Sequence, residues 1–192
     1  MSERAKPTER SDDELVQRVQ KGETRLYAQL VARYQDAVYG MARRFVRSRS
    51  DAEDLAQEAF LRAYRGLEGF KREARFSTWL YRITWNLCAD WLRRHRGRAA
   101  VSMDDARELA DGAVNLEADA VDAEDRRAVR AALERLDERY RSVVTLLYYQ
   151  KLSYEEIAEV LQCPLKTVET RLYRARKRLK ASLQKAGVGG AP

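Results

Sequence analysis

SYEEIAEVLQCPLKTVETRLYRARKRLK, residues 153–180 of the chain, predicts two helices joined by a tight turn. Ser153 followed by Glu156 forms a capping box, which marks the N-terminus of a helix. Apolar residues recur at helical spacing as far as Gln162, a position where many turns of this kind carry glycine. Pro164 then favours the start of a second helix, because proline is tolerated at the first helical position.

The second helix carries a dense row of positive charge and one acid, Glu169. Its basic residues are Lys166, Arg171, Arg174, Arg176, Lys177, Arg178 and Lys180. Two helices at a tight turn with a basic second helix are typical of a helix-turn-helix, whose second helix enters the major groove of DNA. The alternative is an ordinary helical hairpin with a solvated basic face.

The composition favours a soluble, all-helical protein of 192 residues. Nine glycines, three prolines and 35% charged residues fit long-chain helix formers, and a net charge of +7 suits a polyanionic partner. No apolar run approaches the ~20 residues that span a bilayer. We therefore expect no membrane insertion and a cytoplasmic location.

The inventory of reactive side chains predicts neither an enzyme nor a metal site. Cys88, Cys163 and His95 are too few for a zinc site made by this chain alone, and they give no disulfide framework. We expect both cysteines to pack as small apolar residues, with redox sensing as the alternative. No nucleophile with a partner base and no phosphate-binding loop is visible, so we expect no cofactor.

Charge divides the chain into two helical domains, residues 11–97 and 126–186. Residues 101–125 hold nine acids and one base, with few aromatics and no sustained period. Such a segment cannot bury enough apolar surface to fold alone, so residues 98–125 are expected to form a flexible acidic linker. Residues 1–10 are expected to be disordered and residues 187–192 to form a flexible tail.

The N-terminal domain begins with capped helices. Ser11 with Glu14 and Ser50 with Glu53 have capping-box spacing. Residues 51–65 form an amphipathic helix whose first turn is acidic, which complements the helix dipole. On a basic chain these acids also indicate a second, protein partner.

The next helix carries more aromatic surface than one buried stripe needs. It follows a loop over residues 66–76, and Ser77 or Thr78 is expected to cap it. Aromatic rings set among cations are what a single strand of nucleic acid requires, because each base offers a face to stack on. The alternative is that the tryptophans belong to the core and the arginines are solvated.

Three motifs together resemble one known family, the extracytoplasmic-function sigma factors of the sigma-70 family. They are DAEDLAQEAFLRAYRGLEGF at residues 51–70, ARFSTWLYRITWN at residues 74–86 and LSYEEIAEVLQCPLKTVETRLYRARKRL at residues 152–179. The likeness covers nearly the whole chain. It implies a dissociable subunit that directs bacterial RNA polymerase to promoters and assists melting of the −10 element. It also implies control by an anti-sigma factor.

The resemblance assigns residues 11–97 to the family's region 2 and residues 126–186 to region 4. Region 2 would bind the coiled coil of the polymerase's largest subunit, and region 4 would lie near the flap region. The residues implied for polymerase binding are Asp51, Asp54, Leu55, Gln57, Glu58 and Arg62. Those implied for the −10 element are Phe70, Lys71, Arg72, Arg75, Phe76, Ser77, Trp79, Tyr81, Arg82 and Asn86.

Within that set, Phe70 would wall a pocket for an extruded base, Asn86 would lie beneath it, and the cations would hold phosphates. The residues implied for the −35 duplex are Lys166, Thr167, Glu169, Thr170, Arg171, Tyr173, Arg174, Arg176 and Lys177. Glu169 departs from the arginine or lysine often found there, and an acid can accept a hydrogen bond from a cytosine amino group. Two alternatives remain, a conventional helix-turn-helix repressor or activator and an RNA-binding or adaptor protein.

Overall fold

The computed structural model describes residues 10–46, 48–95 and 120–187, and over these ranges it contains helices and no strand. The predicted all-α class is therefore confirmed. Nearly all of the two expected terminal segments, and most of the expected linker, lie outside the described residues. The elements are α1 (Asp12–Gln20), η1 (Thr24–Leu26), α2 (Tyr27–Arg43), α3 (Arg49–Gly66), α4 (Phe76–His95), α5 (Ala120–Glu134), α6 (Glu138–Val144), η3 (Thr145–Tyr149), α7 (Tyr154–Leu161) and α8 (Leu165–Lys185).

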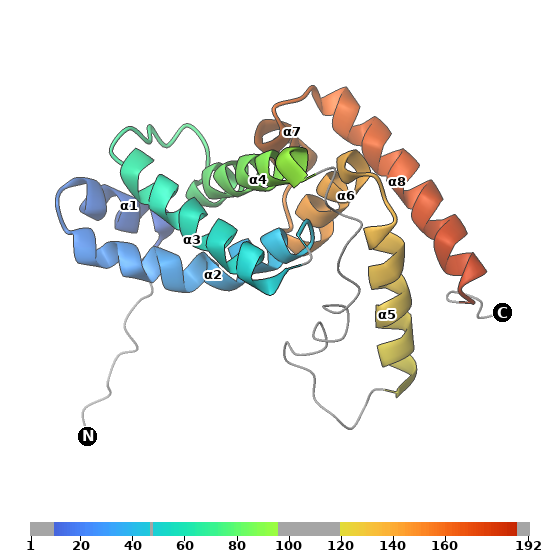
Figure 1. Ribbon diagram of the computed structural model, residues 1–192. Coiled ribbons are helices and arrows are strands. Elements are labelled where there is room, and N and C mark those ends of the chain that lie inside the picture. The colour runs from blue at the N-terminus through green and yellow to red at the C-terminus, as the bar shows by residue number, and fades with distance from the viewer. Residues whose placement is uncertain (1–9, 47, 96–119, 188–192) are drawn as a thin grey trace, which may run out of the picture.

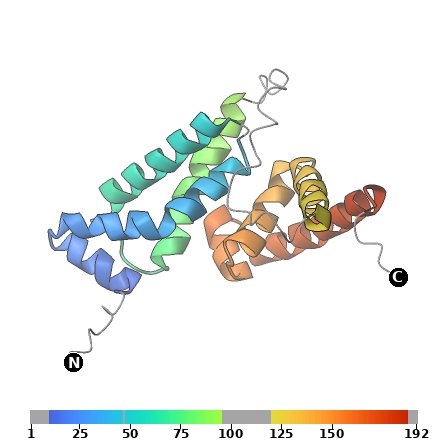
Figure 2. The ribbon, with the colours of Figure 1, turned by 90° about the horizontal axis from the view of Figure 1, so that it is seen from below.

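Helices α1 to α4 form one lobe and α5 to α8 form the other, and the two lobes lie side by side (Figures 1 and 2). Helix α4 is central, because it contacts α1, α2 and α3 in its own lobe and α7 in the other. Its Leu80 is fully buried, as are Leu15 of α1 and Leu30 of α2. Residues 120–125, expected to be linker, belong to α5.

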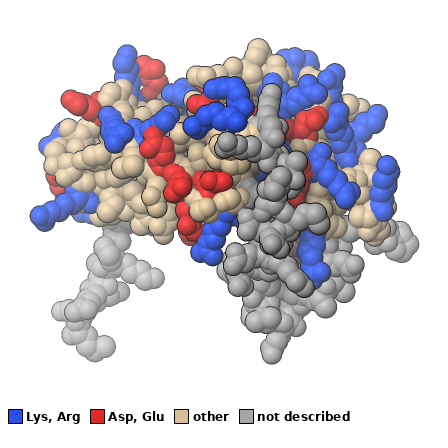
Figure 3. All heavy atoms as spheres, viewed as in Figure 1, with Lys and Arg blue, Asp and Glu red and all other residues tan. Residues whose placement is uncertain are grey.

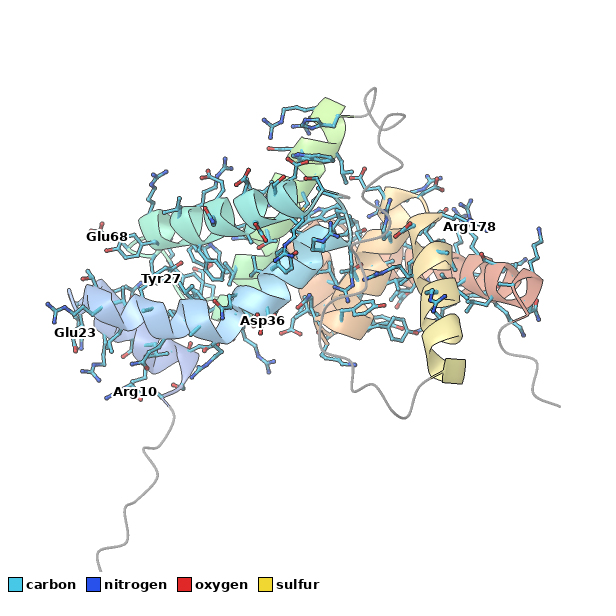
Figure 4. All side chains as sticks on the ribbon, turned by 60° about the horizontal axis from the view of Figure 1, so that its bottom comes forward. Arg10, Glu23, Tyr27, Asp36, Glu68 and Arg178 are labelled. Atoms are coloured by element: carbon cyan, nitrogen blue, oxygen red, sulfur yellow. The ribbon has the colours of Figure 1, made fainter. Side chains whose placement is uncertain are left out.

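Tyr27 joins α2 to α3, toward which it points in Figure 4. Its hydroxyl donates a hydrogen bond of 2.7 Å to the carbonyl of Phe60, and its ring lies 5.0 Å from that of Tyr64. Burial raises the pKa of the Tyr27 phenol. This contact holds α3 in place while leaving the opposite side of that helix to solvent.

The helix starts were predicted with mixed success. Ser11 caps α1 by accepting a hydrogen bond of 3.2 Å from the Glu14 amide, as expected. Ser50 was predicted to cap α3, and this was wrong: Ser48 caps the helix by accepting a hydrogen bond from the amide of Asp51. Ser77 or Thr78 was predicted to cap α4, and this was also wrong, because both lie inside the helix. Its first residue is Phe76, whose ring is buried.

The helix-turn-helix is formed by α7 and α8. Both halves of the capping box are present, with Ser153 accepting from the Glu156 amide at 3.2 Å and the Glu156 carboxylate accepting from the Ser153 amide at 2.8 Å. Gln162 ends α7 in the left-handed conformation, with φ 49°. Pro164 is the N-cap of α8 rather than its first helical residue.

A π-helical turn, η3, links α6 to the helix-turn-helix. The turn buries Leu146 while leaving Tyr148 and Tyr149 exposed. The ring of Tyr149 lies under the guanidinium of Arg44, 3.5 Å from its centroid, so η3 also reaches α2 in the other lobe.

We predict that Gln162→Gly stabilises the C-terminal lobe. The left-handed conformation destabilises a residue with a Cβ by about 1–2 kcal/mol, and glycine avoids this cost. Glycine also lowers the free energy of unfolding by roughly 0.5–1 kcal/mol, because its unfolded state has more conformational freedom. The expected net gain in the free energy of unfolding is about 0.5–1 kcal/mol, measured by urea unfolding. Gln162→Ala keeps the Cβ and should give no gain. A glycine variant less stable than the parent would contradict this account of the turn.

Candidate nucleic-acid and protein interfaces

Three aromatic rings pack against one another at the N-terminal end of α4. Phe70 is 8% exposed and stacks on Trp79, with ring centroids 4.7 Å apart. Phe76 is buried, and its ring lies 6.2 Å from that of Phe70 and 5.9 Å from that of Trp79. Phe70, expected to wall a base pocket, is therefore packed inside this cluster, and Trp79 alone of the three has a partly exposed surface.

Polar and cationic side chains surround this cluster. Lys71, Arg72, Arg75 and Asn86 are exposed, and Ser77 and Arg82 are half-buried. Arg72 has a φ of 60°, which turns the loop sharply between the ring cluster and α4. The structure thus brings four of the expected cations and Asn86 to the surface of one loop and helix.

Tyr81 is placed differently from the other expected contacts. It is 5% exposed, and its ring meets that of Tyr34 edge-on at 6.3 Å. Burial raises the pKa of its phenol to about 12, so the hydroxyl stays protonated. In this structure Tyr81 supports the helix from inside instead of facing solvent.

The remaining tryptophans of α4 are partly used in packing. Trp85 meets Phe45 edge-on at 5.1 Å, and Trp91 stacks on His95 at 4.2 Å. Both are half-buried. Part of the aromatic excess therefore belongs to the core, while Asn86, next to Trp85 in the chain, is exposed.

Helix α3 presents an acidic outer face, which Figure 3 shows as a trail of acids across the N-terminal lobe. Asp54 and Gln57 are exposed, Asp51 and Glu58 are half-buried, and the exposed Arg62 pairs with Glu58 at 2.7 Å. Leu55, expected to face a partner, is buried in the core.

Sequence reasoning missed Leu61 on the same face of α3. Its side chain is 50% exposed, and it lies seven residues after Asp54, two turns along one stripe. Its position outside the buried stripe of Leu55, Ala59 and Ala63 was the available signal. An exposed leucine among acids is typical of a surface that a protein partner covers.

Helix α8 buries one face and exposes the basic one, which gathers along that helix in Figure 3. Val168, Leu172 and Ala175 are buried, and Tyr173 is 70% exposed. Of the expected DNA contacts, Lys166, Glu169, Arg174, Arg176 and Lys177 are also exposed, whereas Thr167, Thr170 and Arg171 are half-buried.

Two of these side chains are held in place by hydrogen bonds. Arg176 donates to the hydroxyls of Tyr148 and Tyr154, both at 3.2 Å. The hydroxyl of Thr170 donates to the Lys166 carbonyl at 2.8 Å, so its methyl group is free to meet a base edge.

Four cations line a hollow of about 270 Å³ beside the N-terminal half of α8. Its lining residues are Arg139, Tyr140, Lys166, Thr167, Thr170, Arg171 and Arg174. Arg139 and Tyr140 come from α6 and were missed by sequence reasoning, because they lie far from α8 in the chain. A concave surface with four positive charges and the hydroxyl of Thr167 suits a phosphate group.

Asp137 fixes the rim of this hollow. It accepts a hydrogen bond of 2.8 Å from Arg178 and lies 3.7 Å from Arg139. Arg178, labelled in Figure 4, also lies over the ring of Tyr140 at 4.6 Å. These contacts tie α8 to the start of α6, so the two helices present their cations together.

Glu156 connects the helix-turn-helix to the loop before α4. The same carboxylate that caps α7 accepts a hydrogen bond of 3.3 Å from Thr78 and lies 3.5 Å from a guanidinium nitrogen of Arg75. Thr78 is 1% exposed, whereas the Arg75 side chain is 81% exposed. An acid of one lobe is thus paired with an expected phosphate contact of the other.

Comparison with known proteins identifies the two lobes separately. The profile of "Sigma-70 region 2" matches residues 30–98, and that of "Sigma-70, region 4" matches residues 126–179. The RNA polymerase sigma-H factor of Pseudomonas aeruginosa is 39% identical over 189 residues, which cover 92% of this chain and 96% of that protein. The ECF RNA polymerase sigma-E factor of Escherichia coli K12 is 39% identical over 182 residues, covering 91% and 95%.

The chain belongs to the extracytoplasmic-function group of the sigma-70 family. A solved structure of CnrH in complex with the cytosolic domain of CnrY is similar throughout, with a TM-score of 0.69 and 31% identity over 91% of this chain and 97% of that one. The sigma factor RpoE of Bartonella quintana, solved with the anti-sigma factor NepR, shares the fold with a TM-score of 0.64 at 24% identity.

Three further features of the described residues bear on the expectations for membrane spans, metal sites and cysteines. No helix within the described ranges is long and apolar enough to cross a membrane. The same residues contain no cluster of ligands that could hold a metal ion. Cys88 is buried, and burial raises the pKa of its thiol to about 12. A thiol in that state is unreactive near neutral pH, which favours the packing role over redox sensing.

We predict that Arg139→Ala weakens binding to duplex −35 DNA regardless of its sequence. Removing one phosphate contact should lower the slope of log K against log salt by about 0.9. The slope is measured by fluorescence anisotropy, with the sigma factor bound to core polymerase. Arg135→Ala removes an exposed arginine that does not line the hollow, and it is the matched control. An unchanged slope for Arg139→Ala would remove this residue from the interface.

Proposed function

We propose that this chain is a dissociable sigma factor that directs bacterial core RNA polymerase to promoters and assists opening of the −10 element. Two separate basic surfaces and one acidic helix face in a single chain carry this proposal. A repressor needs the helix-turn-helix, but it needs neither the acidic face of α3 nor the aromatic surface of α4. Because polymerase and its template lie in the cytoplasm, we place the protein there.

The N-terminal lobe would bind the −10 element as a single strand. Lys71, Arg72, Arg75 and Arg82 would hold phosphates, and Trp79 and Asn86 would meet bases. Unstacking a base costs a few kcal/mol, and stacking on an aromatic ring returns about 1–3 kcal/mol. These terms nearly cancel, so opening would require polymerase to hold the duplex on either side. Phe70 would contribute by fixing Trp79, on which it stacks.

The C-terminal lobe would bind the −35 element as a duplex. Glu169, Thr170, Tyr173 and Arg174 would face base edges from α8, while the hollow that Thr170 and Arg174 help to line would take a phosphate. Lys166 lies 3.3 Å from Glu169, so the acid is not isolated before DNA binds. Glu169 would favour a base that donates a hydrogen bond in the major groove, such as cytosine.

The acidic face of α3 would bind the largest subunit of polymerase. Asp54, Gln57, Glu58 and Arg62 supply polar contacts, and Leu61 supplies an apolar centre. This arrangement resembles the general anatomy of protein interfaces, in which an apolar core lies inside a polar rim. DNA could not bind this face, because its acids would repel phosphates.

The two lobes would have to separate on a promoter. The −10 and −35 elements lie about two helical turns apart, ~70 Å by the repeat of DNA. In the structure the α4 lobe and α7 are in direct contact. A linker of about 25 residues reaches roughly 80–90 Å when extended, so it permits the change. We therefore assign the observed arrangement to the free protein.

We propose in addition that an anti-sigma factor holds the protein inactive. The similar chain CnrH is solved with the cytosolic domain of CnrY, and RpoE of Bartonella quintana with the anti-sigma factor NepR. A partner that stabilises contact between the lobes would prevent them from reaching the two promoter elements together. The protein itself would carry out no reaction.

Transcription with purified components tests the proposed function. Core polymerase alone should give no promoter-specific transcript from a genomic library, and core polymerase with this protein should give a defined set. A conventional repressor would instead protect its site from nuclease without polymerase. Absence of any specific transcript, with a footprint by the protein alone, would overturn the proposal.

We predict that Glu156→Gln raises the affinity of the free protein for a single-stranded −10 oligonucleotide by up to about fivefold. Glutamine preserves the capping box but removes the charge that faces Arg75. An exposed ion pair contributes ~0.2–1 kcal/mol, which sets this limit. Binding is measured by fluorescence anisotropy. Glu155→Gln, on an exposed neighbour, is the control, and equal affinities of the two variants would show that Glu156 does not compete with the strand.

A further inference from the structure

The backbone before α4 is held by a residue that lies far from it in the sequence. Gln20, the last residue of α1, is half-buried, and its amide nitrogen donates to the carbonyls of Leu67 and Phe70 at 2.8 and 3.0 Å. These two carbonyls flank the turn that leads out of α3. One side chain therefore spans a turn that lies 47 and 50 residues away in the chain.

The amide is well suited to this task. A glutamine NH₂ group carries two hydrogens, and both are used here on different carbonyls. The Leu67 carbonyl also accepts a hydrogen bond from the Phe70 amide at 3.1 Å. The turn is therefore held by its own backbone hydrogen bond and by the two bonds from the Gln20 side chain. The clamp ends at Phe70, after which the exposed residues Lys71 and Arg72 begin.

Helix α1 is a firm support for this clamp. Leu15, Val16 and Val19 are buried in the core of the lobe. At its other end Asp12 accepts hydrogen bonds from Arg33 and Tyr34 of α2. Because α1 is anchored at both ends, its terminal glutamine holds the loop in a defined position.

We propose that Gln20 is a positioning residue for capture of the −10 strand. By holding the backbone of Phe70, it fixes the position of the Phe70 ring and the direction in which the exposed side chains of Lys71 and Arg72 project. Neither α1 nor Gln20 lies within residues 30–98, the range matched to sigma-70 region 2. The inference rests on the proposed role of the 70–86 segment in opening the promoter.

Two isosteric substitutions test this role. Gln20→Met keeps the length of the side chain but removes both donors, and Gln20→Glu replaces the donors by a carboxylate that repels both carbonyls. The same changes at Gln17, an exposed glutamine one turn earlier on α1, are the controls. The complete chain is used, together with core polymerase and a duplex promoter labelled with 2-aminopurine in the −10 element.

We expect the rate of promoter opening to fall about tenfold in both Gln20 variants, the effect of losing one or two ordinary hydrogen bonds. Formation of the closed complex and affinity for core polymerase should stay within about twofold, as should both Gln17 controls. A template with the −10 element already unpaired should restore transcription. Trypsin should also cut after Lys71 and Arg72 faster than in the parent.

A different pattern would overturn the inference. Equal opening by Gln20→Met and Gln17→Met would show that the clamp is not used. Equal losses in polymerase affinity and in opening, unrelieved by the unpaired template, would show that Gln20 only holds the lobe together. If the parent protein itself gives no promoter-specific transcript, the proposed function fails instead, so the two failures are distinguishable.

Discussion

The packing of α4 is the constraint on which the rest of the structure depends. This helix supplies core residues to its own lobe, carries the aromatic surface, and contacts α7 of the other lobe. Its partly buried tryptophans serve both the core and the aromatic surface, because each packs one part of its ring on the core and leaves another part exposed. A helix used on so many sides cannot shift without disturbing every neighbour, which makes it a stable platform for a mobile strand.

Supports around α4 come from distant parts of the chain. Gln20 clamps the turn before it, and Tyr27 holds α3 beside it. Glu156 reaches it from the helix-turn-helix while also capping α7. The charge on Glu156 is the element that a promoter would replace, because a phosphate can pair with Arg75 in its stead. The ion pair between Glu156 and Arg75 would then compete with DNA.

Local signals in the sequence predicted much of this fold. The helix caps at Ser11 and Ser153 follow from short-range spacing, and both are present, although only Ser153 forms both halves of a capping box. The start of α4 could not be read locally, because the ring of Phe76 packs against Tyr34 of α2 and Phe70 of the preceding loop. Two serines within three residues, Ser48 and Ser50, both suit a cap, and spacing alone does not choose between them.

The candidate sites were less predictable for a related reason. An aromatic residue on α4 can serve the core or a base, and Tyr81 and Phe70 proved to be buried. Arg139 and Gln20 lie beside residues far away in the chain, and no spacing rule reveals such contacts. Leu61 was within reach, since it interrupts the polar face of α3. Resemblance to a family suggested which surfaces to consider, whereas the structure showed which of their side chains are buried and which are exposed.

The most direct test of the account is the distance between the lobes. Spin labels at Glu73, in the loop before α4, and Glu159, on α7, report that distance by pulsed electron resonance without touching the residues in contact. The account predicts a short distance in the free protein and an increase by tens of ångströms in the complex with polymerase and promoter, toward the ~70 Å between the two elements. A transcribing complex in which the labels stay as close as in the free protein would contradict it.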